Sequence, residues 1–361
     1  MPPSTRWKAP IHHFSYRSLV IPPILLAAAT IVVLFIHSDV NAALLWSQCH
    51  SHARIPAISR IPGIGTPLCY IVSFFRAALH SLRSTAVMAV VIAFVGGLLT
   101  VSTVEAARIC NAPNVLIAYP TGPWLIFDLV GGAVVWELVI IPAFLHRARS
   151  VLNAKKRDDG NGEVRSIFTS RHLPDSELVA IPISVAVGYF VPSILMLFYT
   201  TPATIGIWLF FPVYVTIIRQ ITRKIVISIR RADPTTVHLA SNRRSLVLVY
   251  LLPIICSILA HIFFIWSLTQ PDDRKEMTRS IIVFIEVDTQ FIFWTVLYWM
   301  LVEVGWRVPF TTAVTTLVVG PGAGTCVGWM YREKLIHHDS EDEGEDESAA
   351  QPADEETPLL Q

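Results

Sequence analysis

Charge is scarce in this sequence. Asp, Glu, Lys and Arg make up 15% of the 361 residues, whereas hydrophobic residues make up 53%. A soluble domain usually carries about 25% charged residues, and the few charges here are clustered, so the composition excludes a soluble domain large enough to act alone. The formal net charge is +1. That balance gives no concentrated basic face, so we expect no nucleic-acid partner.

Several catalytic motifs are also missing. The chain has no P-loop, no GxGxxG that opens a helix after a strand, and no GxSxG. Residues 272–276 look like a DDxxE diphosphate motif, but Arg274 and Lys275 stand between the acids and would compete with Mg²⁺. The sequence has no second acidic motif at equivalent depth to supply the other Mg²⁺ ligands, so ionisation of a diphosphate by Mg²⁺ clusters is not supported.

Cysteine is sparse and odd in number. The five cysteines are scattered, mostly within apolar runs, which fits small buried residues better than a disulfide framework. The cluster Cys49-His50-Ser51-His52 lacks partners at zinc-ligand spacing. We therefore expect no metal and no cofactor.

What the sequence does contain is apolar runs of about 20 residues, the length of a membrane-spanning helix. The eight candidate spans are 19–36, 85–104, 123–145, 178–199, 203–221, 245–268, 281–303 and 308–330. A ninth segment, 64–82, is interrupted by Pro67, Arg76 and His80 and favours an interfacial or re-entrant helix. The sequence thus predicts an all-α polytopic transmembrane bundle of eight to nine spans over residues 19–331. It follows a polar N-terminus (1–18) and precedes a disordered acidic tail (332–361).

Lysine and arginine predict the orientation of the bundle. The loops 147–171 and 219–244 are rich in both residues and should face the cytosol. Segments 108–122, 200–202 and 269–279 are then lumenal, and so is the tail. The first apolar run has no cleavage site after it, so we expect an anchored protein of the endoplasmic reticulum or another endomembrane.

The last residues of the tail contain a pattern that conflicts with this orientation. Residues 355–360, Glu-Glu-Thr-Pro-Leu-Leu, match an acidic dileucine sorting signal, which can be read only from the cytosol. The alternative is a solvated tail with two incidental leucines.

Placing an ionisable residue within the bilayer costs free energy, so such residues are the first candidates for a functional site. Most of them fall at span ends predicted to be lumenal, which suggests one polar pocket open to that side. The residues are Glu105, Arg108, Asp128, Glu137, His261, Glu286 and Asp288. Glu137 lies deeper and could pair with His261 or with a backbone group.

Spacing refines two of these groups. Glu105 and Arg108 are helix neighbours at i and i+3, followed by Asn111, and form either an Arg-held carboxylate that orients a substrate or an interfacial ion pair. Glu286 and Asp288 point about 200° apart on a helix, so only one can face the pocket. We favour Asp288, because aromatic residues lie on the same helix face. Helix packing alone would also explain such a row of aromatic residues.

Three stretches resemble fungal membrane-bound terpene cyclases of the ascofuranone and macrophorin (meroterpenoid) type. They are residues 61–65 (Ile-Pro-Gly-Ile-Gly), 100–111 (Thr-Val-Ser-Thr-Val-Glu-Ala-Ala-Arg-Ile-Cys-Asn) and 119–123 (Tyr-Pro-Thr-Gly-Pro). The later residues that look similar are Tyr250, Ser257, His261, Asp288 and Trp294. The resemblance implies cyclisation of a farnesyl chain on a quinol or phenol by protonation of a terminal alkene or epoxide, without a metal. The partners it implies are a lipophilic prenylated small molecule and membrane lipid.

The resemblance also implies roles. Its E-x-x-R-x-x-N pattern falls on Glu105, Arg108 and Asn111. The proton donor would be Asp288 or Glu105, because burial disfavours the charged form of a carboxyl group. His261 would receive the final proton or form part of the hydrogen-bond network around the acid. Arg108 and Asn111 would orient the acid or the substrate oxygen, and the substrate would also contact Asp128, Glu286 and Trp294. Asp128 stands where the resemblance leads us to expect a neutral amide, which bears on substrate choice.

Two other functions compete with the cyclase. An ion-coupled carrier also uses intramembrane acids, but it should show related halves, and none is visible in the sequence. A non-enzymatic scaffold would act through the tail and the basic loops.

Overall fold

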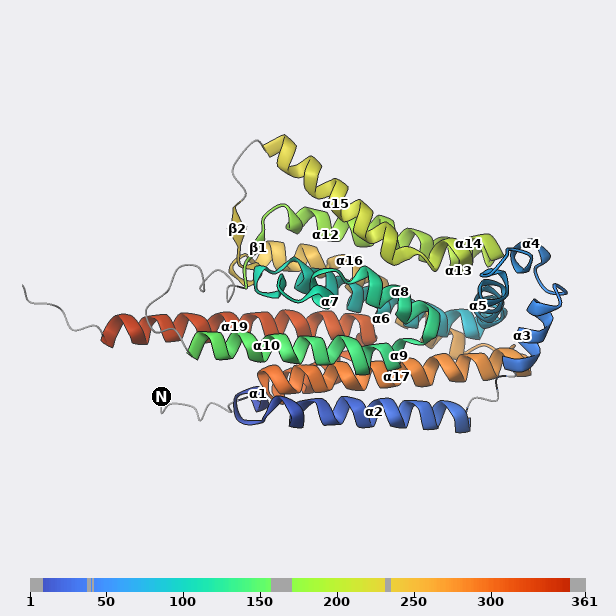
Figure 1. Ribbon diagram of the computed structural model, residues 1–361, viewed down its shortest axis with the longest axis horizontal. Helices are drawn as coiled ribbons and strands as arrows, with labels where there is room; N and C mark the ends of the chain where they lie inside the picture. Colours follow the sequence, from blue (N-terminus) through green and yellow to red (C-terminus); the bar gives the residue numbers. More distant parts are fainter. Residues whose placement is uncertain (1–8, 38–39, 41, 157–170, 231–234, 351–361) are drawn as a thin grey trace, which may run out of the picture.

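The computed structural model describes residues 9–37, 40, 42–156, 171–230 and 235–350. Long helices lie side by side along one axis (Figure 1), with α3, α4 and α5 across one end of the bundle and a two-stranded sheet at the other. We call these the α3–α5 end and the sheet end.

The elements are almost all helical. In chain order they are α1 (Pro10–His13), α2 (Tyr16–His37), α3 (Ala42–His50), α4 (Pro56–Ser59), α5 (Gly65–Ala78), α6 (Leu82–Ala107), η1 (Ile109–Asn111), α7 (Val115–Ala118), α8 (Thr121–Val130), α9 (Gly132–Val135), η2 (Trp136–Ile140), α10 (Ile141–Lys156), β1 (Leu173–Pro174), α12 (Glu177–Val185), η3 (Ala186–Phe190), α13 (Val191–Tyr199), α14 (Pro202–Trp208), α15 (Phe211–Arg230), β2 (Thr236–Val237), η4 (Leu239–Ser241), α16 (Arg243–Leu268), α17 (Glu276–Val304), α18 (Arg307–Val319) and α19 (Pro321–Ala350). Strands β1 and β2 pair antiparallel, with Leu173 opposite Val237.

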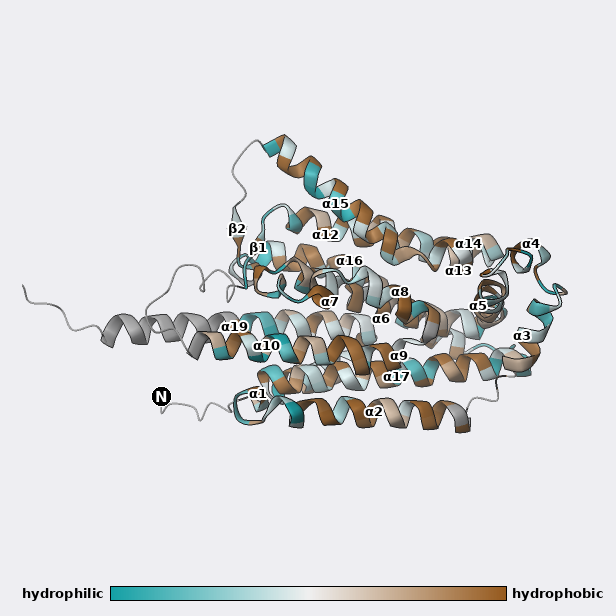
Figure 2. Cartoon of the chain, viewed as in Figure 1, coloured by the Kyte–Doolittle hydropathy of each residue, from teal (hydrophilic) through white to brown (hydrophobic). Residues whose placement is uncertain are grey.

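Membrane-spanning helices form the frame of the bundle. Five stretches within the described residues are long and apolar enough to cross a membrane: in α2, in α6, in the run from α12 to α13, in α16 and in α17. The pair α14 and α15, bent by 55°, passes the same test when its helices are taken together and is either a broken span or a re-entrant loop. Figure 2 shows brown, apolar residues along these helices and teal, polar residues gathered toward their ends. The predicted all-α membrane bundle is therefore present, but the described residues hold five candidate spans, or six if the bent pair is one span, rather than eight or nine.

The span predicted at 123–145 is wrong, because the chain reverses at Gly131. The φ of Gly131 is 120°, a conformation that only glycine adopts readily. Helix α8 runs to this turn, and α9, η2 and α10 return beside it: the rings of Trp124 and Trp136 lie 5.9 Å apart, and Asn114 donates to the carbonyl of Ala143. We call this helical hairpin, residues 121–156, hairpin A.

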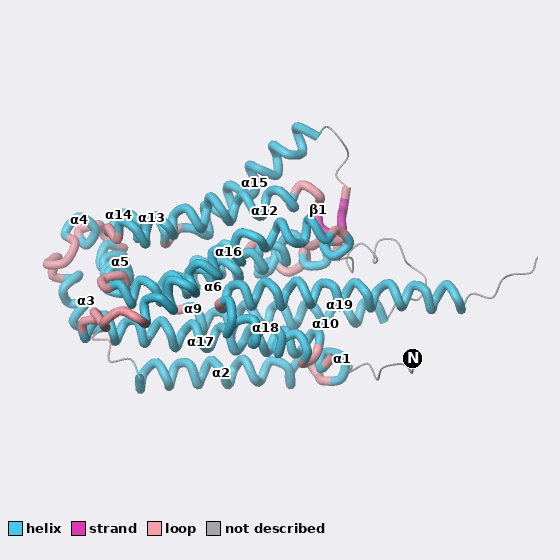
Figure 3. Tube along the Cα trace, turned by 180° about the vertical axis from the view of Figure 1, so that it is seen from behind, coloured by secondary structure: helices cyan, strands magenta, loops and turns pink. Residues whose placement is uncertain are grey.

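The span predicted at 308–330 is wrong for the same reason. The chain turns at Gly320, with φ 94°, and α19 returns along α18, as seen from behind in Figure 3. A methyl group at Gly324 would collide with Thr316, and one at Gly328 with Thr312, so small residues allow the two helices to pack closely. We call residues 307–336 hairpin B.

The hairpins change the predicted orientation. Both hairpins open toward the sheet end, where the described parts of the arginine-rich segments also lie (Figure 1). Segment 108–122, predicted to be lumenal, lies there too: the N–H of Ile109 donates to the carbonyl of His172. Segments 200–202 and 269–279 lie at the α3–α5 end, opposite the basic loops as predicted (Figure 1). Helix α19 leaves hairpin B at the sheet end, so the start of the tail lies with the basic loops rather than opposite them.

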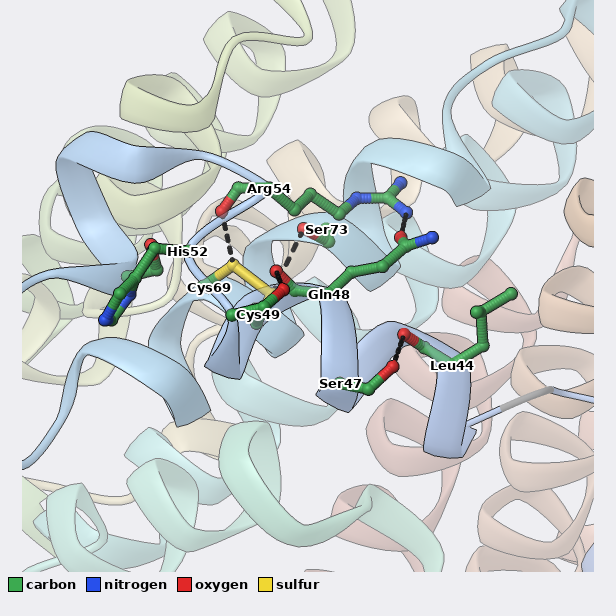
Figure 4. The surroundings of a disulfide bond; sticks show 10 residues. Leu44, Ser47, Gln48, Cys49, His52, Arg54, Cys69 and Ser73 are labelled. Atoms are coloured by element: carbon green, nitrogen blue, oxygen red, sulfur yellow. Dashed lines mark hydrogen bonds between the residues drawn. A yellow bond between two sulfur atoms is a disulfide. The ribbon is translucent and has the colours of Figure 1, made fainter.

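A disulfide joins α3 to α5, contrary to the expectation of scattered free cysteines. Cys49 and Cys69 are bonded, while Cys110, Cys256 and Cys326 are free. Figure 4 shows the bond beneath the 50–55 loop, where Arg54 also donates to the Gln48 side chain. Cys49 and Cys69 are 20 residues apart. This spacing does not predict a disulfide, because nothing in the sequence shows that α5 folds back on α3. Helix α5 has 14 residues and lies across the bundle end, as predicted for an interfacial segment at 64–82.

The structure describes the tail, predicted to be disordered, only as far as residue 350. Helix α19 continues to Ala350, where the sequence predicted disorder from residue 332. Residues 351–361, which include the dileucine pattern, lie outside the described residues, as do residues 1–8 of the polar N-terminus.

Candidate active site

The predicted polar pocket is divided in two. One group of residues forms a charged cluster at the sheet end of α6. A second group, of carboxyl side chains without a cation, surrounds the Gly131 turn of hairpin A.

The charged cluster is built around Glu105, in the last turn of α6. Arg108 donates from Nε to Glu105 Oε1 at 3.0 Å, and Asn111 donates to Oε2 at 2.9 Å. This is the pairing that the E-x-x-R-x-x-N spacing indicated. Helix α19 contributes the two residues that sequence reasoning missed: Arg332 lies 3.3 Å from Glu105, and Glu333 lies 2.6 Å from Arg108. Both follow directly on the last apolar run, where we expected only the start of a tail.

The cluster is balanced in charge and largely buried, although the Arg171 side chain is 25% exposed. The carboxylates of Glu105, Glu303 and Glu333 face the guanidinium groups of Arg108, Arg171 and Arg332. Burial alone would lower the pKa of Arg108, but Glu105 and Glu333 more than offset it and raise that pKa above its ordinary value. A carboxylate held by three arginines and an amide keeps its negative charge. Glu105 therefore fits the role of an anchor better than that of a proton donor.

Asp288 lies at the turn of hairpin A. Its Oδ1 accepts a hydrogen bond from the N–H of Ala133 at 3.0 Å, at the start of the returning helix. A carboxylate is favoured at a helix N-terminus, where free N–H groups point outward. Asp288 thus fastens the turn of hairpin A to the middle of α17.

Glu137 lies one helical turn beyond Ala133 and is fully buried. The Thr30 hydroxyl lies 3.1 Å from both of its oxygens, and the Thr295 hydroxyl lies 3.4 Å from one. Each hydroxyl also lies within 3.0 Å of a carbonyl in its own helix, and it has one proton to donate. No cation pairs with Glu137 among the residues that the structure describes. The two partners considered for it from the sequence, His261 and a backbone group, are replaced by the two threonines.

Asp128 precedes the turn on α8. Its Oδ2 is buried and has no hydrogen-bond partner among the described residues. Aromatic rings gather on the same hairpin: the ring of Trp124, one helical turn earlier, lies 4.7 Å from Phe127 and 6.0 Å from Phe211. A neutral carboxyl group beside aromatic faces is suited to giving up a proton to an apolar substrate, because such faces stabilise a developing cation.

The remaining predicted residues are placed elsewhere. His261 lies at the other turn, against Gly320. Glu286 and Trp294 lie on the exposed face of α17, away from the face that carries Asp288. The structure therefore brings Asp128, Glu137 and Asp288 to one turn, and leaves His261, Glu286 and Trp294 apart from it.

No metal centre emerges from the described part of the chain. No three His, Cys, Asp or Glu side chains there come together as metal ligands would. In the DDxxE-like stretch, Asp272 binds Arg274 at 2.9 Å, and Asp273 accepts the N–H of Leu82 at 2.6 Å. Both carboxylates are thus engaged by protein groups.

Two hollows flank Trp124 beside hairpin A. The first, between α6, α8 and α15, encloses about 260 Å³ including its open mouth, and the second, between α6, α7, η2 and α10, about 220 Å³. Pro120 and Trp124 line both.

Comparison with known proteins gives one match. The family model described as the CtvD domain matches residues 25–271, which include hairpin A and the E-x-x-R-x-x-N segment but end before Asp288. No curated protein and no solved structure matches.

Proposed function

Because the chain belongs to the CtvD domain family, which is related to the fungal meroterpenoid terpene cyclases, we propose that it cyclises a prenylated quinol or phenol by protonation. The family supports a membrane-bound cyclase of the terpenoid class. The observation that supports the finer proposal is a group of carboxyl side chains around one turn of the membrane bundle that pair with no cation among the residues the structure describes: Asp128, Glu137 and Asp288.

The acid is Asp128. A proton donor to an alkene or epoxide must be neutral before the reaction, and Asp128 has a buried oxygen with neither a cation nor a hydrogen-bond donor to stabilise its charged form. Glu105 is held by arginines, and Asp288 accepts a backbone N–H. Glu137 is enclosed between α2 and α17, where its threonine contacts leave no side open to a substrate.

The reaction balances without an external reagent. With an alkene, the O–H bond of Asp128 breaks, a C–H bond forms at the less substituted carbon of the terminal double bond, and the tertiary cation left on the dimethyl carbon is attacked by the next alkene to form the ring. With an epoxide, the proton goes to the epoxide oxygen and a C–O bond breaks, leaving a hydroxyl. A final C–H bond then breaks, and its proton passes to a carboxylate, a role that we assign to Asp288. Either product is an isomer of the substrate.

Product analysis tests this proposal. Microsomes from a yeast that expresses the chain would be given farnesylated quinols and phenols, with and without a terminal epoxide. We expect an isomer of unchanged mass, formed at least about 100-fold more slowly by Asp128→Asn and Asp288→Asn, the usual scale for loss of an acid or base. Glu276→Gln, exposed at the start of α17, is the matched control and should keep full turnover. No conversion by a well-expressed protein would overturn the proposal.

One observation favours a carrier as the second candidate. Hairpins A and B are both broken helices that turn at a glycine within the bundle, and discontinuous helices of this kind form ion and substrate sites in transporters. A carrier predicts proton-coupled flux into vesicles that contain the purified chain. A cyclase predicts product without flux.

A further inference from the structure

Helix α2 lies at the edge of the bundle (Figure 1) and turns one stripe of residues toward it. The buried residues Leu19, Pro23, Ala27 and Thr30 recur every three or four positions, as they do on one face of a helix. The opposite face of α2 is exposed. Thr30 is the polar member of this stripe, so its contact decides how the second half of α2 is held by polar groups.

The contact of Thr30 is with Glu137 of hairpin A. The Thr30 hydroxyl oxygen lies 3.1 Å from both carboxyl oxygens, and the Thr295 hydroxyl oxygen lies 3.4 Å from one of them. All three residues are fully buried. Glu137 thus lies where α2, hairpin A and α17 meet.

The protons available to this contact can be counted. Thr30 Oγ1 lies 2.9 Å from the carbonyl of Leu26, and Thr295 Oγ1 lies 2.8 Å from the carbonyl of Phe291. Both distances are shorter than those to Glu137. Threonine within a helix commonly donates to such a carbonyl, and each hydroxyl has a single proton. With both protons directed at carbonyls, the oxygens of Glu137 receive none.

The surroundings supply no positive charge in place of these protons. The ionisable residues closest to the contact along each surrounding element are Asp288 and Tyr298 on α17, Asp128 on α8, His146 on α10, and Arg17 and His37 toward the two ends of α2. The histidines and the arginine are about two helical turns or more away in sequence. An ionised Glu137 would therefore be a buried charge without a partner among the described residues, which is costly.

We propose that Glu137 is a proton-binding site, and that its bound proton fastens α2 to hairpin A. The protonated carboxyl group is neutral, and its O–H donates to a lone pair of Thr30 Oγ1 while the Thr30 proton stays on the Leu26 carbonyl. Every polar atom of the contact then has a partner of the right kind.

The position of Glu137 gives this proton a consequence for the hairpin. Glu137 is in the π-helical turn Trp136–Ile140, and such turns recur at functional sites. It also lies one helical turn beyond Ala133, which binds Asp288. Loss of the proton would place a bare carboxylate against α2 and release that helix, so protonation controls whether hairpin A is covered by α2 or open to lipid.

Infrared spectroscopy of the purified chain in nanodiscs tests the proton directly. At pH 7, the spectrum of the native chain minus that of Glu137→Gln should contain the C=O stretch of a protonated carboxyl group, which moves to lower frequency in D₂O. Glu276→Gln, at an exposed position on α17, is the matched control and should instead remove a carboxylate band. A carboxylate band in the Glu137→Gln difference would overturn the proposal.

Hydrogen exchange tests whether the proton holds α2. Glu137→Gln keeps a neutral side chain with an N–H donor, so exchange of the backbone amides of residues 23–37 should match the native chain. Glu137→Ala removes the donor and should speed that exchange by about tenfold, the scale of one buried hydrogen bond. Thr30→Val removes the acceptor with little change of shape, should have the same effect, and covers the case in which Glu137→Ala does not fold.

The two experiments do not depend on turnover, so they decide the proton site whether the chain is a cyclase or a carrier. Native exchange in both Glu137→Ala and Thr30→Val would show that the contact does not hold α2. Faster exchange in Glu137→Gln, equal to that in Thr30→Val, would show that a neutral donor is not what the contact requires, and would also overturn the proposal.

Discussion

The Asp288 carboxylate accepts a hydrogen bond from the N–H of Ala133 at 3.0 Å, across 155 residues of sequence. Ala133 is at the start of a helix that begins within the bundle, where its N–H has no helical partner. An unsatisfied backbone group in a membrane interior is costly. Asp288 removes that cost and fixes the position of the turn around which Asp128 and Glu137 lie.

Removing this acceptor should loosen hairpin A. Asp288→Ala leaves a buried N–H unpaired, and we expect a loss of about 1–3 kcal/mol in stability, measured as a lower unfolding midpoint in detergent. Asp288→Asn keeps an acceptor oxygen, so its loss of stability should be less than half that of Asp288→Ala. Equal losses in the two variants would show that the hydrogen bond does not hold the turn.

The hairpins explain why two of the eight predicted spans were wrong. Hydropathy measures the length and composition of an apolar run, and residues 123–145 and 308–330 satisfy both criteria. The reversal depends on one glycine with a positive φ in each run, Gly131 and Gly320, and many membrane helices carry glycines that do not turn. Of the remaining predicted spans, 203–221 is bent by 55° between α14 and α15, and the other five coincide with helical stretches that satisfy the same length and hydropathy criteria.

The site could be predicted only in part, for a related reason. The pairing of Glu105 with Arg108 is local and follows from helix geometry. The contact of Arg108 with Glu333, or of Asp288 with Ala133, depends on how distant elements pack, and a misassigned span places such residues at the wrong end. The sequence thus identified the costly residues correctly but could not say which of them lie together.

The stability of the charged cluster should depend on its guanidinium groups as well as on its carboxylates. Arg332 contacts Glu105, Glu303 and Glu333, so Arg332→Met removes one cation from three carboxylates and leaves the buried cluster with an excess of negative charge. Breaking a buried ion pair in this way costs about 3–5 kcal/mol, which should appear as a large loss of monodisperse protein in size-exclusion chromatography. Arg244→Met, at an exposed arginine near the same end, is the control and should behave like the native chain. A normal elution profile for Arg332→Met would rule out the cluster as a structural anchor.

The disulfide and the basic loops lie at opposite ends of the bundle, and both point to the same orientation. Disulfides persist in oxidising compartments, and basic loops stay in the cytosol. We therefore expect a cysteine introduced at exposed Ser241 to react with a membrane-impermeant maleimide from the cytosolic side of sealed microsomes. Cys49 and Cys69 should react only after permeabilisation and reduction. Labelling of Ser241→Cys only after permeabilisation would invert the orientation.

The disulfide between Cys49 and Cys69 should stabilise the α3–α5 end of the bundle. Closing a loop of this length contributes about 3 kcal/mol in the chain-entropy description. Cys49→Ser should lower the unfolding midpoint by a corresponding amount, and the double variant Cys49→Ser, Cys69→Ser should lower it no further. A reducing agent should affect the native chain and leave both variants unchanged.

Acid should loosen the start of α6, because Asp273 binds the N–H groups of Leu82 and Arg83 there. Burial is the largest single influence and raises the pKa of Asp273, but the hydrogen bonds to its carboxylate, led by those from the N–H groups of Leu82 and Arg83, together outweigh burial and hold that pKa below its ordinary value. A depressed folded pKa means that the stabilisation is present above the unfolded pKa, near 4, and is lost as the pH falls through the lower folded value. The unfolding midpoint of the native chain should therefore fall with pH below about 4. In Asp273→Asn it should already be lower at pH 7 and fall less steeply in acid, while Glu276→Gln, a nearby exposed substitution, should follow the native curve. Parallel acid limbs for the native chain and Asp273→Asn would show that another group governs the acid sensitivity.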